Sequence, residues 1–188
     1  MSLERVDTMR LVHWIDGLSE KLASVVSWAL LLNALLITFN AISRKVFSVA
    51  WSSAFDMQWH FFAAVVFITA AYALQKNEHV RVDVFANRIG ERGLAWIDLF
   101  GILFVLLPVC AGMMWLSGPK FWEALVAGHT RATRESSSAI PAWIILSFIP
   151  FGFALLALQG LAEAVRCIAF LRGIETGSRA NRRFFDGE

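Results

Sequence analysis

Four polar side chains within or beside apolar segments are the residues of this sequence that could carry chemistry. Asn33 and Asn40 lie seven residues apart, so a helix would place both amides on one face, where they could bind a neighbouring helix. Asp56 and His60 lie four residues apart and would also share a face, as a hydrogen-bonded pair. A proton relay is one use of such a pair. Its position within about two helical turns of a segment end favours a structural role at the membrane interface.

Motifs for catalysis or cofactor binding are absent from the sequence. It holds no GxSxG, HExxH or glycine-rich phosphate loop, and His60 alone among the histidines lies near an apolar segment, whereas a haem between helices needs facing histidine pairs. Cys110 and Cys167 would lie at different depths, so no disulfide is expected. We therefore predict no enzymatic activity, no metal site and no cofactor.

The elements that must position these residues are four apolar segments of 21 to 24 residues, at 22–42, 51–74, 96–116 and 139–162. About 20 helical residues cross a bilayer core, so each segment is long enough to span it. The chain is 57% hydrophobic and 17% charged, and its charges gather between the segments. The sequence predicts an all-α membrane protein with four transmembrane helices in a single domain, 1–173, followed by a basic tail, 174–188, that is predicted to be flexible.

The amino-terminal region predicts an additional helix before the first span. Apolar residues recur there at helical spacing while three charged residues fall mostly elsewhere around the wheel. Such a helix would lie along the membrane surface or pack on its own bundle. The apolar positions are Leu11, Trp14, Ile15, Leu18 and Leu22, and the charged ones are Asp16, Glu20 and Lys21.

Lysine and arginine are distributed unequally between the two sides of the predicted bundle. Three precede the first span, four lie in the loop 75–93 and five follow Glu163, which places twelve of the 17 on one side. The other two connections carry the remaining five. Because cytoplasmic loops carry the excess of positive charge, both termini are predicted to be cytoplasmic.

Several short patterns in this sequence resemble the DctQ family, the small four-span membrane subunit of tripartite ATP-independent periplasmic (TRAP) transporters. The most specific follows the second span, where a basic turn leads into the sequence His79-Val80-Arg81-Val82-Asp83. Other patterns follow the family's order: Asn40, Arg44 and Phe47; Gln58-Trp59 and Phe62; Glu135-Ser136, Pro141, Trp143, Pro150 and Gly152; and Leu158-Gln159-Gly160. The sequence departs from the family at Lys45, Asp56 and His60, where tyrosine, glutamate and tyrosine are common.

The resemblance implies a non-enzymatic role in the bacterial inner membrane. In the family, a periplasmic binding protein delivers a substrate, usually an organic acid, to a large sodium-driven subunit, and the small subunit braces that subunit. By this resemblance, the candidates for contact with the large subunit or a neighbouring helix are Asn33, Asn40, Arg44, Asp56 and His60. The cytoplasmic family cluster is His79, Arg81 and Asp83. The candidates for docking the binding protein are Lys120, Arg131, Arg134 and Glu135, with membrane lipid as a further partner.

Two other classes of protein fit the composition. A free-standing small transporter would have four spans, but the middle thirds of these segments contain no Asp, Glu, Lys or Arg that could couple transport to protons. A membrane anchor of a redox complex would need ligands for its cofactor. Transport by the chain alone would identify the first class, and a haem absorbance band would identify the second.

Overall fold

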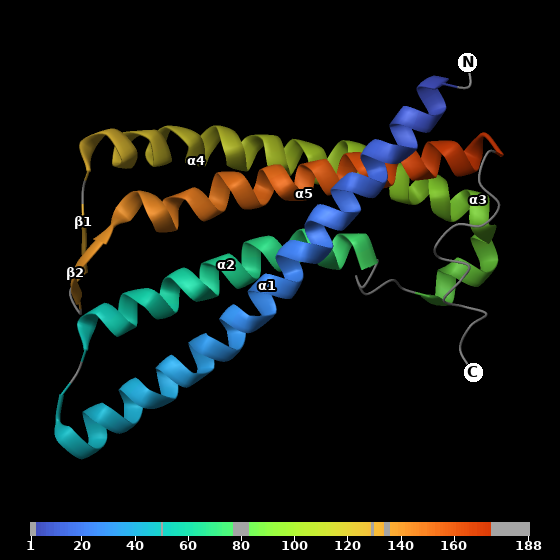
Figure 1. Cartoon of the computed structure of the whole chain (residues 1–188). Coiled ribbons are helices and arrows are strands. Elements are labelled where there is room, and N and C mark those ends of the chain that lie inside the picture. The colour runs from blue at the N-terminus through green and yellow to red at the C-terminus, as the bar shows by residue number, and fades with distance from the viewer. Residues whose placement is uncertain (1–2, 50, 77–82, 129, 134–135, 174–188) are drawn as a thin grey trace.

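The computed structural model describes residues 3–49, 51–76, 83–128, 130–133 and 136–173 (Figure 1). The elements are helices α1 (Leu3–Phe47), α2 (Ser52–Lys76), α3 (Asp83–Gly101), η1 (Ile102–Leu106, a π-helix), α4 (Leu107–Ala127) and α5 (Ala142–Leu171), and strands β1 (Thr130–Thr133) and β2 (Ser136–Pro141).

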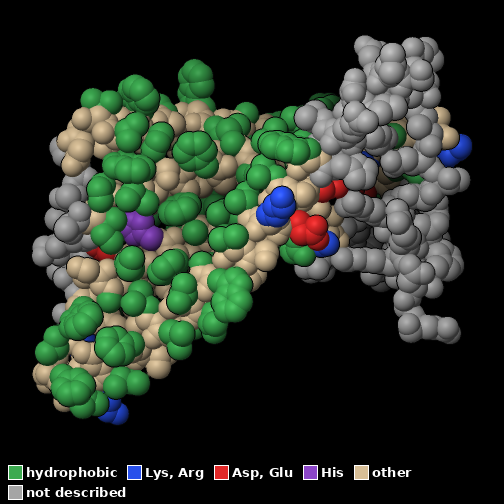
Figure 2. Space-filling view, in the orientation of Figure 1, with side chains coloured by type: hydrophobic (Ala, Val, Ile, Leu, Met, Phe, Trp, Pro, Cys, Tyr) green, Lys and Arg blue, Asp and Glu red, His purple; other side chains and the backbone are tan. Residues whose placement is uncertain are grey.

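Four helical stretches of the described chain are long and apolar enough to cross a membrane. They are Trp14–Phe47, Ser53–Lys76, Arg92–Ala127 and Ala142–Leu171, and the third runs continuously through α3, η1 and α4. The predicted fold class, a helical membrane protein with four spans, is confirmed. Figure 2 shows the matching surface, where hydrophobic side chains cover most of the described helices on this face.

Helix α1 is a single element that joins the predicted amino-terminal helix to the first span. Its 45 residues would extend over about 68 Å, and Figure 1 shows it crossing α5 diagonally before it continues beside α2. Residues at intervals of three and four, including Val12, Ile15, Ser19 and Val26, are buried on one face. Asp16 also lies on this buried face, although the charged residues of this region fall mostly elsewhere around the helical wheel.

Helix α5 is the centre of the bundle, because it contacts α1, α2, α3, η1 and α4. Two of its glycines allow close approach of neighbours. A Cβ built on Gly152 would lie 2.5 Å from Cβ of Phe67 in α2, and one on Gly160 would lie 2.4 Å from Cδ2 of Leu106 in η1. Glycine is therefore required at Gly152 for contact with α2, since even one methyl group would collide there.

The third span has two irregular points. At Gly90 the backbone takes φ 74° and ψ 164°, which kinks α3 before the membrane-spanning part begins. The π-helix η1 then interrupts the span, and its wider turn keeps Ile102, Leu106 and Cys110, each four residues apart, against the rest of the bundle. Beyond η1, helix α4 packs on the bundle through a narrow stripe of residues and leaves most of its surface exposed.

An antiparallel hairpin, β1 with β2, connects α4 to α5. It lies at the end of the bundle that also holds the turn between α1 and α2, and β2 contacts α2 (Figure 1). Helix α3 and the C-terminal end of α5 lie at the other end. These two strands were not predicted from the sequence.

Candidate functional site

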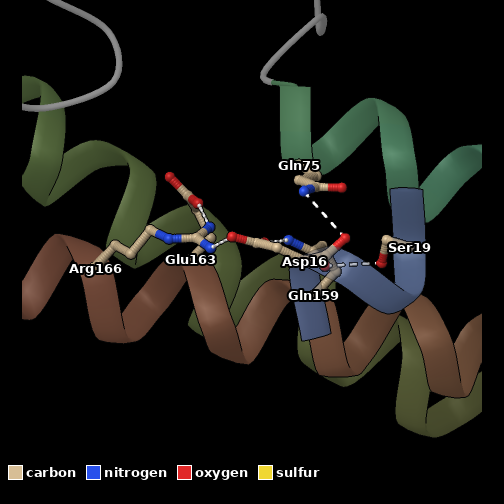
Figure 3. A network of polar contacts seen from close by, with 6 residues as sticks. All are labelled: Asp16, Ser19, Gln75, Gln159, Glu163 and Arg166. Carbon is tan, nitrogen blue, oxygen red and sulfur yellow. Dashed lines mark hydrogen bonds and ion pairs between the residues drawn. The ribbon is translucent and has the colours of Figure 1, made fainter. Parts of the chain in front are cut away.

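The most concentrated group of charged and polar side chains lies where α1 crosses α5. Arg166 of α5 donates from Nη2 to Oδ2 of Asp16 in α1, and from Nη1 to Oε2 of Glu163 at 2.7 Å (Figure 3). The side chains of Asp16 and Arg166 are only 13% and 11% exposed. Two carboxylates therefore share one guanidinium in a nearly dry environment, where such pairing offsets the cost of burying charge.

Three neutral side chains complete this group. Gln159 donates from Nε2 to Oδ1 of Asp16 at 3.0 Å, and its Oε1 accepts a bond from the Ser19 hydroxyl at 3.0 Å. From α2, Gln75 donates to the backbone carbonyl of Asp16 at 3.3 Å. Ser19 and Gln159 have no exposed surface. We call these six residues, Asp16, Ser19, Gln75, Gln159, Glu163 and Arg166, the crossing network, and it joins α1, α2 and α5.

The chemistry that this arrangement permits is structural. Both carboxylate oxygens of Asp16 accept bonds from side chains of α5, so each one is engaged in holding the two helices together. A buried network in which each member is bonded fixes one packing of its helices, because any other packing would leave a charge unpaired. At its edge, Lys76 of α2 pairs with Glu20 of α1 at 3.2 Å in a more exposed position.

Sequence reasoning missed the crossing network. In the sequence, Asp16 is one of three charged residues that fall mostly elsewhere around the helical wheel, and Arg166 contributes only to the positive charge of the predicted cytoplasmic side. A signal was present in α5, where Gln159, Glu163 and Arg166 follow at intervals of four and three and so lie on one face. Their partner lies about 150 residues away in α1, and nothing in either segment alone identifies it.

The predicted helix-contact residues lie elsewhere, towards the turn between α1 and α2. Asn40 is buried and its Oδ1 accepts a 3.5 Å bond from the Trp51 backbone, so it caps this turn. Asn33 is half-buried, and its buried Oδ1 has no hydrogen-bond partner among the described residues. Arg44 is exposed.

The Asp56 and His60 pair lies at the start of α2. Asp56 is buried, and the described contact joins its backbone carbonyl to Nδ1 of His60 at 2.6 Å. The buried Nε2 of His60 has no partner in the described part of the chain. This contact is a helical side-chain to backbone bond, and the structural role of the pair stays a prediction.

The structure describes three of the seven loop candidates. His79, Arg81, Arg134 and Glu135 lie outside the described residues. Asp83 begins α3 and Arg131 lies in β1. Lys120 is exposed on α4, towards the hairpin. Within the described ranges, no group of three or more His, Cys, Asp or Glu side chains could hold a metal ion.

Comparison with known families agrees with this fold. Residues 33–170, most of the chain, match the family model described as "Tripartite ATP-independent periplasmic transporters, DctQ component". The match includes the second, third and fourth spans and the α5 part of the crossing network, and it begins after Asp16 and Ser19. No curated protein and no solved structure matches the chain. The protein is thus a multi-pass membrane protein that belongs to the DctQ family, the small membrane component of TRAP transporters.

Proposed function

We propose that this chain is the stationary brace of a TRAP transporter in a bacterial inner membrane. In this role it binds the large sodium-coupled permease subunit and helps to dock the periplasmic protein that delivers an organic acid. The observation that carries the proposal is the family match over residues 33–170. DctQ proteins are transporter components and not an enzyme family, so we assign substrate binding and transport to the partner proteins.

Two features of the fold support a brace. The crossing network fixes α1 against α2 and α5, and the contact of Gly152 with Phe67 fixes α2 against α5. Outside these contacts, α1 and α4 leave large apolar side chains exposed, such as Trp28 at 68% and Trp115 at 82%. In a bilayer such surfaces face lipid or another subunit, and they give the large subunit a broad apolar surface to pack against.

The end of the bundle that holds the hairpin is the proposed docking surface for the binding protein. The excess of Lys and Arg on the side of α3 and both termini favours a periplasmic position for the hairpin. Lys120 and Arg131 supply positive charge there, and Arg134 and Glu135 follow in sequence. Charge complementarity steers transient partners, so these residues are suited to a short-lived contact.

Helix and subunit contacts are proposed for the remaining candidates. Asn33, Asn40, Arg44, Asp56 and His60 belong to the half of the α1 and α2 pair nearest the hairpin, where a large subunit could pack beside them. The family cluster His79, Arg81 and Asp83 is proposed to contact the large subunit or lipid headgroups on the cytoplasmic side.

The test of this function is co-purification followed by reconstitution. The chain is expressed with its cognate large permease subunit, isolated in mild detergent and placed in liposomes with a sodium gradient and the binding protein. We expect the two membrane subunits to co-purify in equal amounts, and uptake of an organic acid only when all three proteins are present. Uptake by this chain alone, or purification of the large subunit without it, would overturn the proposal.

Docking is tested separately by reversing charge. A Lys120→Glu and Arg131→Glu double variant should raise the concentration of binding protein needed for half-maximal uptake while the membrane complex still forms. Arg172→Glu is the matched control, because Arg172 is exposed at the opposite end of α5. An equal effect of Arg172→Glu would show that the hairpin end is not the docking surface for the binding protein.

A further inference from the structure

Two prolines interrupt neighbouring helices at nearly the same depth, towards the end of the bundle that holds the hairpin. Pro119 lies inside α4 and Pro150 inside α5, and these two helices pack side by side (Figure 1). Phe121 and Phe151 follow the prolines by two residues and one residue, and their rings lie 5.9 Å apart. Each proline is therefore within about one helical turn of the same contact between α4 and α5.

Each proline weakens its helix at this depth. A proline inside a helix has no N–H, so the carbonyl four residues earlier loses its hydrogen bond, and the ring pushes against that carbonyl. The two carbonyls are those of Trp115 in α4 and Leu146 in α5. Helices bend most readily at such positions. A bend in α4 alone would be opposed by a straight α5, whereas two bends at one depth allow both helices to incline together.

The segments beyond the two prolines belong together. Residues 120–127 of α4 and 142–149 of α5 flank the antiparallel strands β1 and β2, and we call these segments with their hairpin the outer unit. The outer unit contacts α2 through β2. It includes Lys120 and Arg131, which belong to the proposed docking surface.

On the inner side of the prolines, α5 is held tightly. Gly152 follows Pro150 by two residues and lies so close to α2 that an added Cβ would be 2.5 Å from Cβ of Phe67. Further along α5, the crossing network joins this helix to α1. The part of α5 that follows Pro150 is thus fixed against two other helices.

On the outer side, free volume lies beside α5. A cavity of about 310 Å³ is lined by Leu22 of α1, Ile68 of α2 and five residues of α5. Two of these five, Ser147 and Phe148, precede Pro150 and therefore belong to the outer unit. A close-packed interior resists displacement of its side chains, whereas a helix beside a void can move towards it without compressing its neighbours.

We propose that Pro119 and Pro150 form one hinge, about which the outer unit inclines towards this cavity. Three observations carry the proposal: the common depth of the prolines, the close contact at Gly152 on the inner side, and the free volume on the outer side. Its use rests on the proposed function, since the outer unit carries docking residues. The hinge lets the docking surface follow the binding protein while the rest of the bundle stays fixed.

The experiment measures distances between pairs of spin labels on the full-length chain in lipid nanodiscs, by pulsed electron paramagnetic resonance. One label, at Val126→Cys, lies in the outer unit, and the other, at Val25→Cys, lies in α1; both positions are exposed, and the native Cys110 and Cys167 are buried. A second pair, Val25→Cys with Val105→Cys, reports on the inner bundle, because Val105 precedes Pro119 in the third span. The outer pair should give a distance distribution at least about twice as wide as the inner pair, as expected for a hinge motion.

Proline variants locate the hinge. Pro119→Ala with Pro150→Ala restores both hydrogen bonds and should narrow the outer distribution to the width of the inner one. Pro108→Ala is the matched control, because Pro108 is exposed in the same span but precedes Pro119 by 11 residues, about 17 Å, and should leave the distribution unchanged. An outer distribution as narrow as the inner one in the wild-type protein, or an equally wide one in the double variant, would overturn the hinge.

A final measurement tests its use in docking. Addition of the cognate binding protein to the complex with the large subunit should shift and narrow the outer distribution and leave the inner one unchanged. An outer distribution that does not respond would overturn this use. The hinge itself is measured on the chain alone, whereas the proposed function is measured by co-purification and uptake, so the failure of one is distinguishable from the failure of the other.

Discussion

At the scale of single residues, the most consequential side chain is Asp16. Its carboxylate binds Arg166 and Gln159 of α5, and its backbone carbonyl accepts a bond from Gln75 of α2. The sequence pattern could not identify this role, because a carboxylate among apolar residues of an interfacial helix is ordinarily solvated. Only the partner helix shows why it is buried.

Removal of one charge from this pair should destabilise the bundle strongly. Arg166→Gln leaves Asp16 and Glu163 without their shared cation, and we expect a loss of about 3 kcal/mol or more, as for other broken buried pairs. Thermal unfolding in detergent measures it. Lys76→Gln is the control, because the pair of Lys76 with Glu20 is more exposed and should contribute no more than about 1 kcal/mol.

The double variant distinguishes a specific pair from general damage. If Asp16 and Arg166 act together, Asp16→Asn with Arg166→Gln should lose less than the sum of the two single losses, by about 0.5–3 kcal/mol. Strict additivity would mean that the contact does not couple the helices.

At the scale of elements, two glycines of helix α5 set the distances between this helix and its neighbours. Gly152 meets the Cβ of Phe67, an atom next to the backbone, whereas Gly160 meets the terminal Cδ2 of Leu106, which a change of rotamer can move. Both glycines lie within α5, and the difference between them depends on which atom of the neighbouring helix each one meets.

This difference predicts an order of stability. Gly152→Ala should lose about 1–3 kcal/mol, because α2 must move away, and Gly160→Ala should lose less. Gly112→Ala, with open space around it, should be neutral or slightly stabilising. Urea or heat unfolding of the three variants in one detergent gives the order. If Gly160→Ala were the most harmful, the packing described at these two positions would be incorrect.

The π-helix η1 leads to a second prediction at this scale. A π-helix of this length behaves as one extra residue in an α-helix, so deletion of the exposed Phe104 should give a regular helix that still presents Cys110 to the bundle. Deletion of Leu116, also exposed, should rotate the following residues by about 100° and separate Phe121 from Phe151, whose rings lie 5.9 Å apart.

The monodispersity and thermal stability of the purified deletion proteins provide the measurement. We expect near wild-type behaviour without Phe104 and aggregation or a large loss of stability without Leu116. Similar damage from both deletions would show that the π-helix is itself required.

At the scale of the whole molecule, the features that could be predicted from the sequence are those that depend on the length and composition of its segments. Four apolar runs long enough to cross a bilayer identified the four spans, since few other structures accommodate them. The hairpin of β1 and β2 and the π-helix η1 have no recognisable sequence pattern. A short pair of polar strands looks like an ordinary loop, and one extra apolar residue looks like part of an ordinary span. The crossing network could not be predicted either, because it depends on which helices meet.

The orientation of the molecule remains a prediction and can be measured by cysteine labelling in intact cells. Ser48→Cys, in the turn between α1 and α2, should react with a membrane-impermeant maleimide, and Arg172→Cys should react only after permeabilisation. Both positions are exposed, and the native Cys110 and Cys167 are buried, which keeps the background low. Labelling in the reverse pattern would place the termini outside.

The diagonal course of α1 has a mechanical consequence. Its candidate span of 34 residues is about 51 Å long, which exceeds a hydrocarbon core of about 30 Å, and it crosses α5 at an angle (Figure 1). Parallel helices that pack side by side can slide along one another, whereas a helix that crosses them at an angle and is bonded at the crossing resists that shear. Ion-paired and hydrogen-bonded at Asp16, α1 is such a crossing helix, and the four-span bundle can thereby keep its shape, as the proposed role of a brace requires.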